Sequence, residues 1–65
     1  MERNKMSWKA ARTDANMTQE QAAVALDVSK STIINYEKYR TTPDIDTALR
    51  LAAIYGRSID EIKLA

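Results

Sequence analysis

The strongest constraint on the fold is a pair of helix-start signals close together in the middle of the sequence. Thr18, with Gln21 three residues later, has the pattern of a capping box, and Ser29 is a favourable N-cap for a second stretch of helical periodicity. Only Asp27 and Val28 separate the two predicted helices, which cover about residues 18–26 and 29–38. Two short helices joined by so short a turn must cross and pack against each other.

Three more helices are predicted around this pair. Helical spacing predicts the first over residues 4–15, which Asn16 would end in a left-handed conformation. Asp44 suits the N-cap of a later helix that Gly56 ends, and Ser58 with Glu61 forms a second capping box that predicts a short fifth helix. The apolar positions of the fourth helix form one stripe, which we expect to be the most buried: Ile45, Ala48, Leu49, Ala52 and Tyr55, widened by Leu51 and Ile54.

Composition agrees with an all-helical chain and excludes several functions. The 65 residues include one glycine and one proline, which favours helices over hairpins. We therefore expect an all-α fold of five short helices in one domain over residues 1–65. The chain has no cysteine and no histidine, so it lacks the commonest metal ligands and the commonest general base. We expect no metal site, no cofactor and no enzyme activity.

Charge and hydropathy narrow the choice of partners. The net charge is only +1, with seven Lys or Arg against five Asp or Glu in residues 1–40 and three against four in residues 41–65. Any face for nucleic acid is therefore expected in the first two thirds of the chain. No apolar run approaches the roughly 20 residues that span a bilayer, and residues 1–9 do not resemble a secretory signal. We expect a cytoplasmic protein without membrane contact or a small-molecule ligand.

The predicted helix over residues 29–38 has one face that the core does not need. Ile33 and Tyr36 take the inward positions, and Ala23 is small enough to let the two helices approach closely where they cross. The outward positions carry mainly polar side chains: Lys30, Ser31, Ile34, Asn35 and Lys38. Asparagine can bind adenine through two hydrogen bonds, lysine can donate to guanine, and isoleucine can contact a thymine methyl group. The simpler interpretation of these positions is a solvated polar face.

The stretch MTQEQAAVALDVSKSTIINYE, residues 17–37, resembles the helix-turn-helix of the phage repressor and Cro-type family, also called lambda repressor-like or XRE-type. The resemblance continues through Thr42-Pro43 and Leu51-Ala52 to Gly56, and it covers about residues 4–64. It implies a five-helix domain whose helix over residues 29–38 enters the DNA major groove.

The resemblance also assigns roles to particular side chains. It implies that Lys30, Ser31 and Asn35 contact base edges, with Ile34 beside them, that Gln19 contacts a phosphate, and that Arg12 forms an ion pair with Glu37. Because Lys38, Arg40 and Thr41 would lie next to the same face, we expect them to contact phosphates as well. The simpler interpretations are a first-turn residue for Gln19, solubilising charges for Lys38 and Arg40, and unrelated surface charges for Arg12 and Glu37.

Three positions depart from the family pattern. Asp27 stands where glycine is usual in the turn, but Asp tolerates left-handed dihedral angles better than most residues. Tyr39 stands where a glycine commonly ends the helix, so we expect a longer helix and an altered loop after it. Ala22 replaces a larger apolar residue and leaves space for Trp8 or Met17 to fill.

The resemblance implies a regulator of transcription, in particular a repressor, that binds double-stranded DNA and associates with the nucleoid. Because one short helix supplies few base contacts, we expect a homodimer on a two-fold operator. The near-neutral C-terminal third is not needed for phosphate contacts, so dimer contacts are expected from Tyr55, Arg57 and Leu64. Two alternatives stay open, both on the same scaffold: a protein-interaction module, which the low net charge favours, and an antitoxin that neutralises a toxin.

Overall fold

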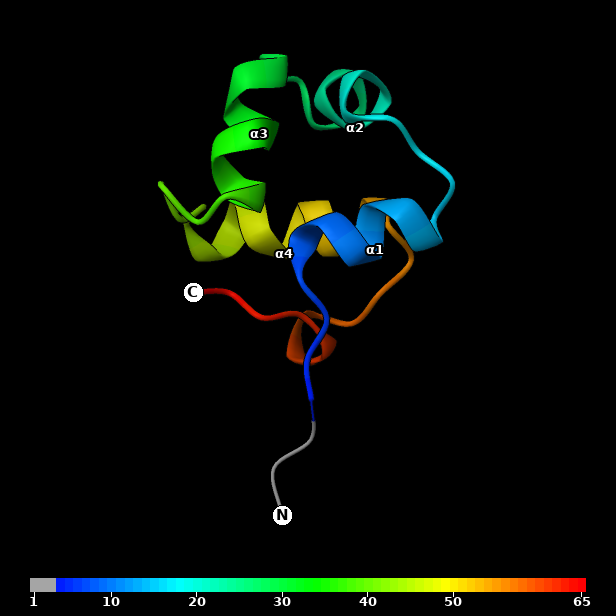
Figure 1. Ribbon diagram of the computed structural model, residues 1–65, viewed down its shortest axis with the longest axis vertical. Coiled ribbons are helices and arrows are strands. Elements are labelled where there is room, and N and C mark those ends of the chain that lie inside the picture. The colour runs from blue at the N-terminus through cyan, green and yellow to red at the C-terminus, as the bar shows by residue number, and fades with distance from the viewer. Residues whose placement is uncertain (1–3) are drawn as a thin grey trace.

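The computed structural model describes residues 4–65, which form four α-helices and one 3₁₀ turn. In chain order the elements are α1 (Trp8–Asp14), α2 (Gln19–Leu26), α3 (Lys30–Glu37), α4 (Ile45–Ile54) and η1 (Ile59–Glu61). In Figure 1, α2 and α3 lie at one end of the molecule, α1 and α4 lie across its middle, and η1 lies toward the other end. The predicted all-α class is confirmed. The expected fifth helix is only a 3₁₀ turn.

Each α-helix begins at a side chain that accepts a backbone N–H from the first turn. The caps are Ser7 for α1, Thr18 for α2, Ser29 for α3 and Asp44 for α4, with N–O distances of 3.1, 3.0, 3.2 and 2.8 Å. Gln21 completes the capping box of α2, because its side-chain oxygen accepts the N–H of Thr18 at 2.9 Å. The caps predicted at Thr18, Ser29 and Asp44 are confirmed.

All four α-helices end in the same motif: a residue in the left-handed conformation, followed by a residue whose backbone N–H donates a hydrogen bond to the carbonyl five residues earlier. The left-handed residues are Asn16, Asp27, Tyr39 and Gly56, with φ of 58°, 64°, 57° and 71°. The N–H groups of Met17, Val28, Arg40 and Arg57 donate to the carbonyls of Arg12, Ala23, Asn35 and Ala52 at 2.9–3.2 Å. Asp27 therefore adopts the left-handed conformation that the turn between α2 and α3 requires, as expected. The expected lengthening of α3 is wrong, because Tyr39 itself adopts the helix-ending conformation.

The two ends of the described chain are hydrogen-bonded to each other. Met6 and Ile62 form an isolated parallel bridge, in which the Met6 N–H donates to the Glu61 carbonyl at 2.9 Å and the Lys63 N–H to the Met6 carbonyl at 2.8 Å. This pairing holds Met6 and Ile62 in extended conformations. As a result, α1 begins at Trp8 rather than at residue 4, and η1 stops at Glu61.

Tyr39 joins these two ends to the end of α3. Its hydroxyl group accepts the N–H of Trp8 at 3.3 Å and donates to the carbonyl of Lys63 at 2.8 Å. The Lys63 ammonium group lies 5.4 Å from the centre of the Tyr39 ring, within the range of a cation–π contact. Three segments distant in sequence therefore meet at one side chain.

The core lies between α1, α2, α3 and α4 and is built around Trp8, Ile33, Leu51 and Ile62, which are all fully buried. The Trp8 and Tyr55 rings meet edge to face with centroids 6.4 Å apart. The buried stripe of α4 is narrower than expected: Ala48, Leu51, Ala52 and Tyr55 are buried as predicted, whereas Ile45 is 60% and Leu49 46% exposed. No helix among residues 4–65 has the length and apolar character that a membrane crossing requires.

Candidate nucleic-acid interface

The turn between α2 and α3 holds the two helices in contact. Ala23 of α2 is buried, and its carbonyl accepts the N–H of Val28 at 2.9 Å, which closes the turn after the left-handed Asp27. Val28 is half-buried against the core, and Ile33 of α3 is fully buried. The inward side of α3 is therefore fixed by packing, and its other side is presented away from the core.

The outward side of α3 carries the side chains that were predicted to contact bases. Lys30 and Ser31 are exposed, whereas Ile34 and Asn35 are half-buried. Lys30 Nζ lies 3.9 Å from Glu20 Oε2 of α2, and both side chains are largely open to solvent, so this ion pair holds Lys30 only weakly. The contact with Glu20 was not predicted, and no helical spacing could have indicated it because the two residues lie on different helices.

A mostly buried polar cluster connects α1, α2 and α3 behind this face. Arg12 Nε donates to Glu37 Oε2 at 2.6 Å and Arg12 Nη2 to Glu37 Oε1 at 3.3 Å, with only 13% and 6% of the two side chains exposed. Arg12 Nη1 also donates to the carbonyl of Met17 at 2.9 Å. The hydrogen bond to Glu37 raises the pKa of Arg12. The structure thus places Arg12 and Glu37 together, as a brace between α1 and the end of α3.

Gln19, at the first position of α2, also belongs to this cluster. Its side-chain nitrogen donates to Glu37 Oε1 at 3.0 Å. An amide nitrogen carries two N–H donors, so one remains for another acceptor. The contact between Gln19 and Glu37 was not predicted. It depends on how α2 and α3 cross, which sequence spacing does not specify.

Tyr55 lies next to the same cluster. Burial, and after it the charge of Glu37, raises the pKa of Tyr55 to about 12. Within residues 4–65 its hydroxyl group and the Trp8 indole nitrogen are buried without a hydrogen-bond partner. Both aromatic side chains are therefore parts of the core and not of an exposed face.

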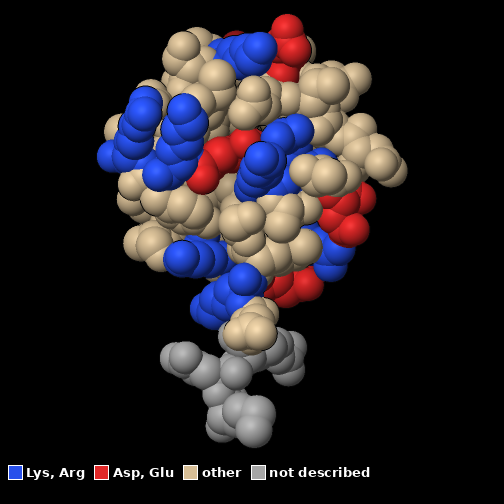
Figure 2. All heavy atoms as spheres, in the orientation of Figure 1, with Lys and Arg blue, Asp and Glu red and all other residues tan. Residues whose placement is uncertain are grey.

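The residues predicted to contact phosphates border the outward side of α3. Lys38, Arg40 and Thr41 are exposed in the turn and loop that follow α3, and Gln19 is half-buried at the start of α2. Figure 2 shows Lys and Arg side chains spread over this face, two of them side by side at the left, with acidic side chains between the other groups. Electrostatic attraction to a polyanion would therefore come from a few cations around α3 and not from the molecule as a whole.

The residues predicted to form dimer contacts are occupied within the chain. Tyr55 is 4% exposed and has almost no surface to offer a partner, so its assignment as a dimer contact is wrong. Arg57 forms ion pairs with Asp14 and, at 3.4 Å, with Glu61. Leu64 is half-buried and packs against the core. Helical spacing had already placed Tyr55 on the buried stripe of α4, whereas it gave no sign of the ion pairs of Arg57, which lies beyond the end of that helix.

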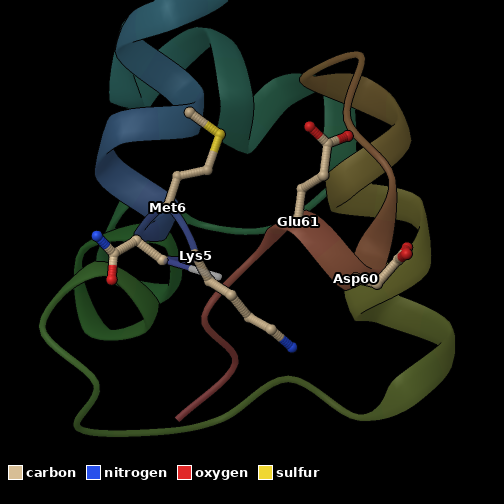
Figure 3. A pocket seen from close by; sticks show the side chains of 5 residues that line it. Lys5, Met6, Asp60 and Glu61 are labelled. Carbon is tan, nitrogen blue, oxygen red and sulfur yellow. The ribbon is translucent and has the colours of Figure 1, made fainter. Parts of the chain in front are cut away.

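A pocket lies between the N-terminal segment and η1, and none of its lining residues belongs to α3 (Figure 3). It is lined by Asn4, Lys5, Met6, Asp60 and Glu61. Glu61 is held within the chain, since its Oε1 accepts the N–H of Ser58 at 2.9 Å. In residues 4–65 no group of three His, Cys, Asp or Glu side chains is placed to hold a metal ion.

Comparisons with known proteins agree on one kind of relative. A family model described as helix-turn-helix matches residues 9–62. The HTH-type transcriptional regulator ImmR of Bacillus subtilis is 40% identical over 52 residues, which are 80% of this chain and 41% of that protein. The uncharacterized HTH-type transcriptional regulator MJ0272 of Methanocaldococcus jannaschii is 40% identical over 47 residues, 72% of this chain and 71% of that protein. The chain thus spans less than half the length of the first relative.

Proposed function

The chain belongs to the helix-turn-helix family of DNA-binding transcriptional regulators, and from this premise we propose that it represses transcription by binding a specific DNA operator through α3. The family is one of regulators rather than of enzymes. The observation that carries the proposal is the asymmetry of α3. Ile33 and Glu37 are fixed from behind, while Lys30, Ser31 and Asn35 lie on the other side of an α-helix, an element that the width of the major groove admits.

Sequence recognition is assigned to four residues on the outward side of α3. Asn35 would bind adenine through its amide, and Lys30 would donate to guanine. Ser31 would form a hydrogen bond with either base, and Ile34 would contact a thymine methyl group. The buried cluster behind Asn35 supports this assignment, because a side chain can discriminate bases only when its helix cannot rotate. Asn35 is itself half-buried, which limits the orientations of its side chain.

Phosphate contacts would set the position of α3 in the groove. Gln19 has one N–H held by Glu37, which leaves the second free to donate to a phosphate at the N-terminal end of α2. Lys38, Arg40 and Thr41, all exposed, would contact the backbone on the other side of α3. The protein would act in the cytoplasm, at the nucleoid, as a homodimer on a two-fold site.

Selection of bound sequences from random duplex DNA at a fixed salt concentration tests this proposal. We expect one consensus with two related half-sites. Asn35→Ala should relax the preference at one base pair of each half-site and weaken binding by about 1–3 kcal/mol. The control is Lys9→Ala, since Lys9 is an exposed residue of α1 outside the proposed face. An Asn35→Ala variant with the base preferences of the parent would contradict the assignment to α3.

The near-neutral charge favours a second candidate, a domain that binds a protein partner such as a toxin through the same scaffold. The selection experiment separates the two candidates. A folded protein that enriches no sequence at any salt concentration would exclude the repressor and favour the protein partner.

A further inference from the structure

The solvent side of α4 carries an apolar row that the fold leaves uncovered. Ile45, Leu49 and Ala53 follow each other in steps of four residues, so they lie in one row along the helix. All three are exposed, and neither Ile45 nor Leu49 belongs to the core or packs against it. Exposed isoleucine and leucine in one row, on a helix whose opposite side is buried, indicate a surface that packs against something else.

Charged side chains border this row on one side only. Asp46 and Arg50 are exposed and lie one turn apart. With 100° of rotation per residue, Asp46 lies about 60° and Arg50 about 100° around the helix axis from Leu49, both in the same direction. The ion pairs recorded within residues 4–65 include neither of them. The row therefore has an acidic and a basic neighbour on the same side, both free to pair with a partner.

We propose that this surface binds a second copy of the chain, with the two α4 helices antiparallel across a two-fold axis beside Leu49. In that arrangement Leu49 meets Leu49 of the second copy, and Ile45 meets the small Ala53. Asp46 then faces Arg50 of the second copy, and the reverse contact follows from symmetry. A parallel arrangement would instead place the charged side of each row next to the uncharged side of the other, so that neither Asp46 nor Arg50 would meet an opposite charge. Charge complementarity therefore selects a second copy in the antiparallel orientation.

The surface is too small to hold a dimer alone. Two large apolar side chains and an alanine fall well short of the ~800 Å² per partner of a stable interface. We expect two copies to pair mainly when adjacent half-sites of DNA raise their local concentration. The proposal rests in this respect on the proposed function. It replaces the dimer contacts expected at Tyr55, Arg57 and Leu64.

Disulfide cross-linking tests the surface directly, because the chain has no cysteine of its own. A Leu49→Cys variant should form disulfide-linked dimers, since facing residues of packed helices lie within the ~4.4–6.8 Å between Cα atoms that a disulfide requires. Ile45→Cys alone should not, because antiparallel packing separates the two positions by about 12 Å along the helix. A mixture of Ile45→Cys and Ala53→Cys chains should cross-link. The matched control is Val24→Cys on α2, which is 80% exposed but lies outside the row.

Charge reversal supplies an independent test on a duplex with two half-sites. Asp46→Arg gives a chain with two positive charges beside the row, and Arg50→Asp gives one with two negative charges. Each variant alone should lose cooperative binding of two chains, whereas an equimolar mixture should recover it. A general loss of folding cannot be reversed by mixing two damaged chains, so recovery would be specific to this pairing.

The outcomes separate this proposal from the proposed function. Cross-linking is measured with the free protein at high concentration and again on the selected duplex. If Leu49→Cys links no better than Val24→Cys in both conditions, or if Ile45→Cys links equally well, the surface or its orientation is wrong, even if DNA binding is intact. If the protein binds no duplex but Leu49→Cys links in solution, the proposed function fails and the surface stands.

Discussion

Tyr39 adopts a backbone conformation that is costly for any residue with a Cβ. The left-handed region costs an L-amino acid roughly 1–2 kcal/mol, and glycine avoids this cost. In return, the Tyr39 hydroxyl group satisfies the N–H of Trp8 and the carbonyl of Lys63. A single side chain thus compensates for its own backbone strain by connecting α3 to both ends of the described chain.

Tyr39→Phe should lower the free energy of unfolding by about 0.5–1.5 kcal/mol, because the part-buried N–H of Trp8 and the exposed carbonyl of Lys63 lose their hydrogen bonds while the backbone strain stays. Urea unfolding of the free protein measures the change. The control is Tyr36→Phe, since no hydrogen bond of the Tyr36 hydroxyl is recorded within residues 4–65. Equal stability of the Tyr39→Phe variant and the parent would show that the hydroxyl group does not stabilise the fold.

Tyr39→Gly separates the strain from the contacts. Glycine relieves the strain but removes both the hydroxyl group and the ring, so we expect this variant to remain less stable than the parent. The same urea titration measures it. A Tyr39→Gly variant more stable than the parent would mean that the strain outweighs everything the side chain contributes.

Among the elements, the contact between α2 and α3 positions the proposed DNA-binding face most directly. Ala23 is 4% exposed, and its carbonyl accepts the N–H that closes the turn between the two helices, so extra side-chain volume there would overpack a buried position. Ala23→Leu should therefore destabilise the fold by about 1–3 kcal/mol, with loss of DNA binding in parallel. The matched control is Ala25→Leu on the same helix, where the side chain is exposed. Thermal melts that fail to distinguish the two variants would contradict a tight crossing at Ala23.

The start of α4 gives the fold a dependence on pH. Hydrogen bonds from Thr47, first from its hydroxyl group and then from its backbone N–H, lower the pKa of Asp44. Because the pKa is lower in the folded state, this cap stabilises the protein above the unfolded pKa of about 3.9, and the contribution is lost as the pH falls through the folded pKa. Asp44→Asn should weaken the pH dependence of unfolding below about pH 4, because the titrating carboxyl group of the cap is removed. Equal slopes for Asp44→Asn and the parent would contradict the prediction.

The helix starts and the outward side of α3 could be predicted from the sequence, whereas the contacts between elements could not. The caps at Thr18, Ser29 and Asp44 act within one turn, so local spacing reveals them. The bridge between Met6 and Ile62 joins residues at opposite ends of the sequence, which no local pattern records. Periodicity likewise placed Ile45 and Leu49 on an apolar stripe, but it could not show that no other part of the fold covers these two side chains. The roles assigned to individual residues at the DNA remain predictions.

At the scale of the whole molecule, near-neutral charge limits the electrostatic part of DNA binding. Three cations border the proposed face: Lys30, Lys38 and Arg40. Two of them, Lys38 and Arg40, are proposed to contact phosphates, and release of about 0.9 counterion for each contact predicts that binding of one chain weakens roughly 12-fold between 50 and 200 mM salt. Arg40→Ala should reduce the slope by about 0.9, while Lys9→Ala should not change it. If the slope is the same for both variants, the loop after α3 does not contact the phosphate backbone.

The bridge between Met6 and Ile62 makes the described chain nearly a closed ring. In Figure 1 the N-terminal end of the described chain points away from α2 and α3, whereas the C-terminal end lies beside the middle of the molecule, where Lys63 contacts Tyr39. A short peptide could join the ends, and new termini could then be opened in the exposed loop after α3, in a circular permutant that keeps every helix. A fluorescent protein or affinity tag would therefore be better fused at the N-terminal end, because the described chain there lies farther from α3 than its C-terminal end does.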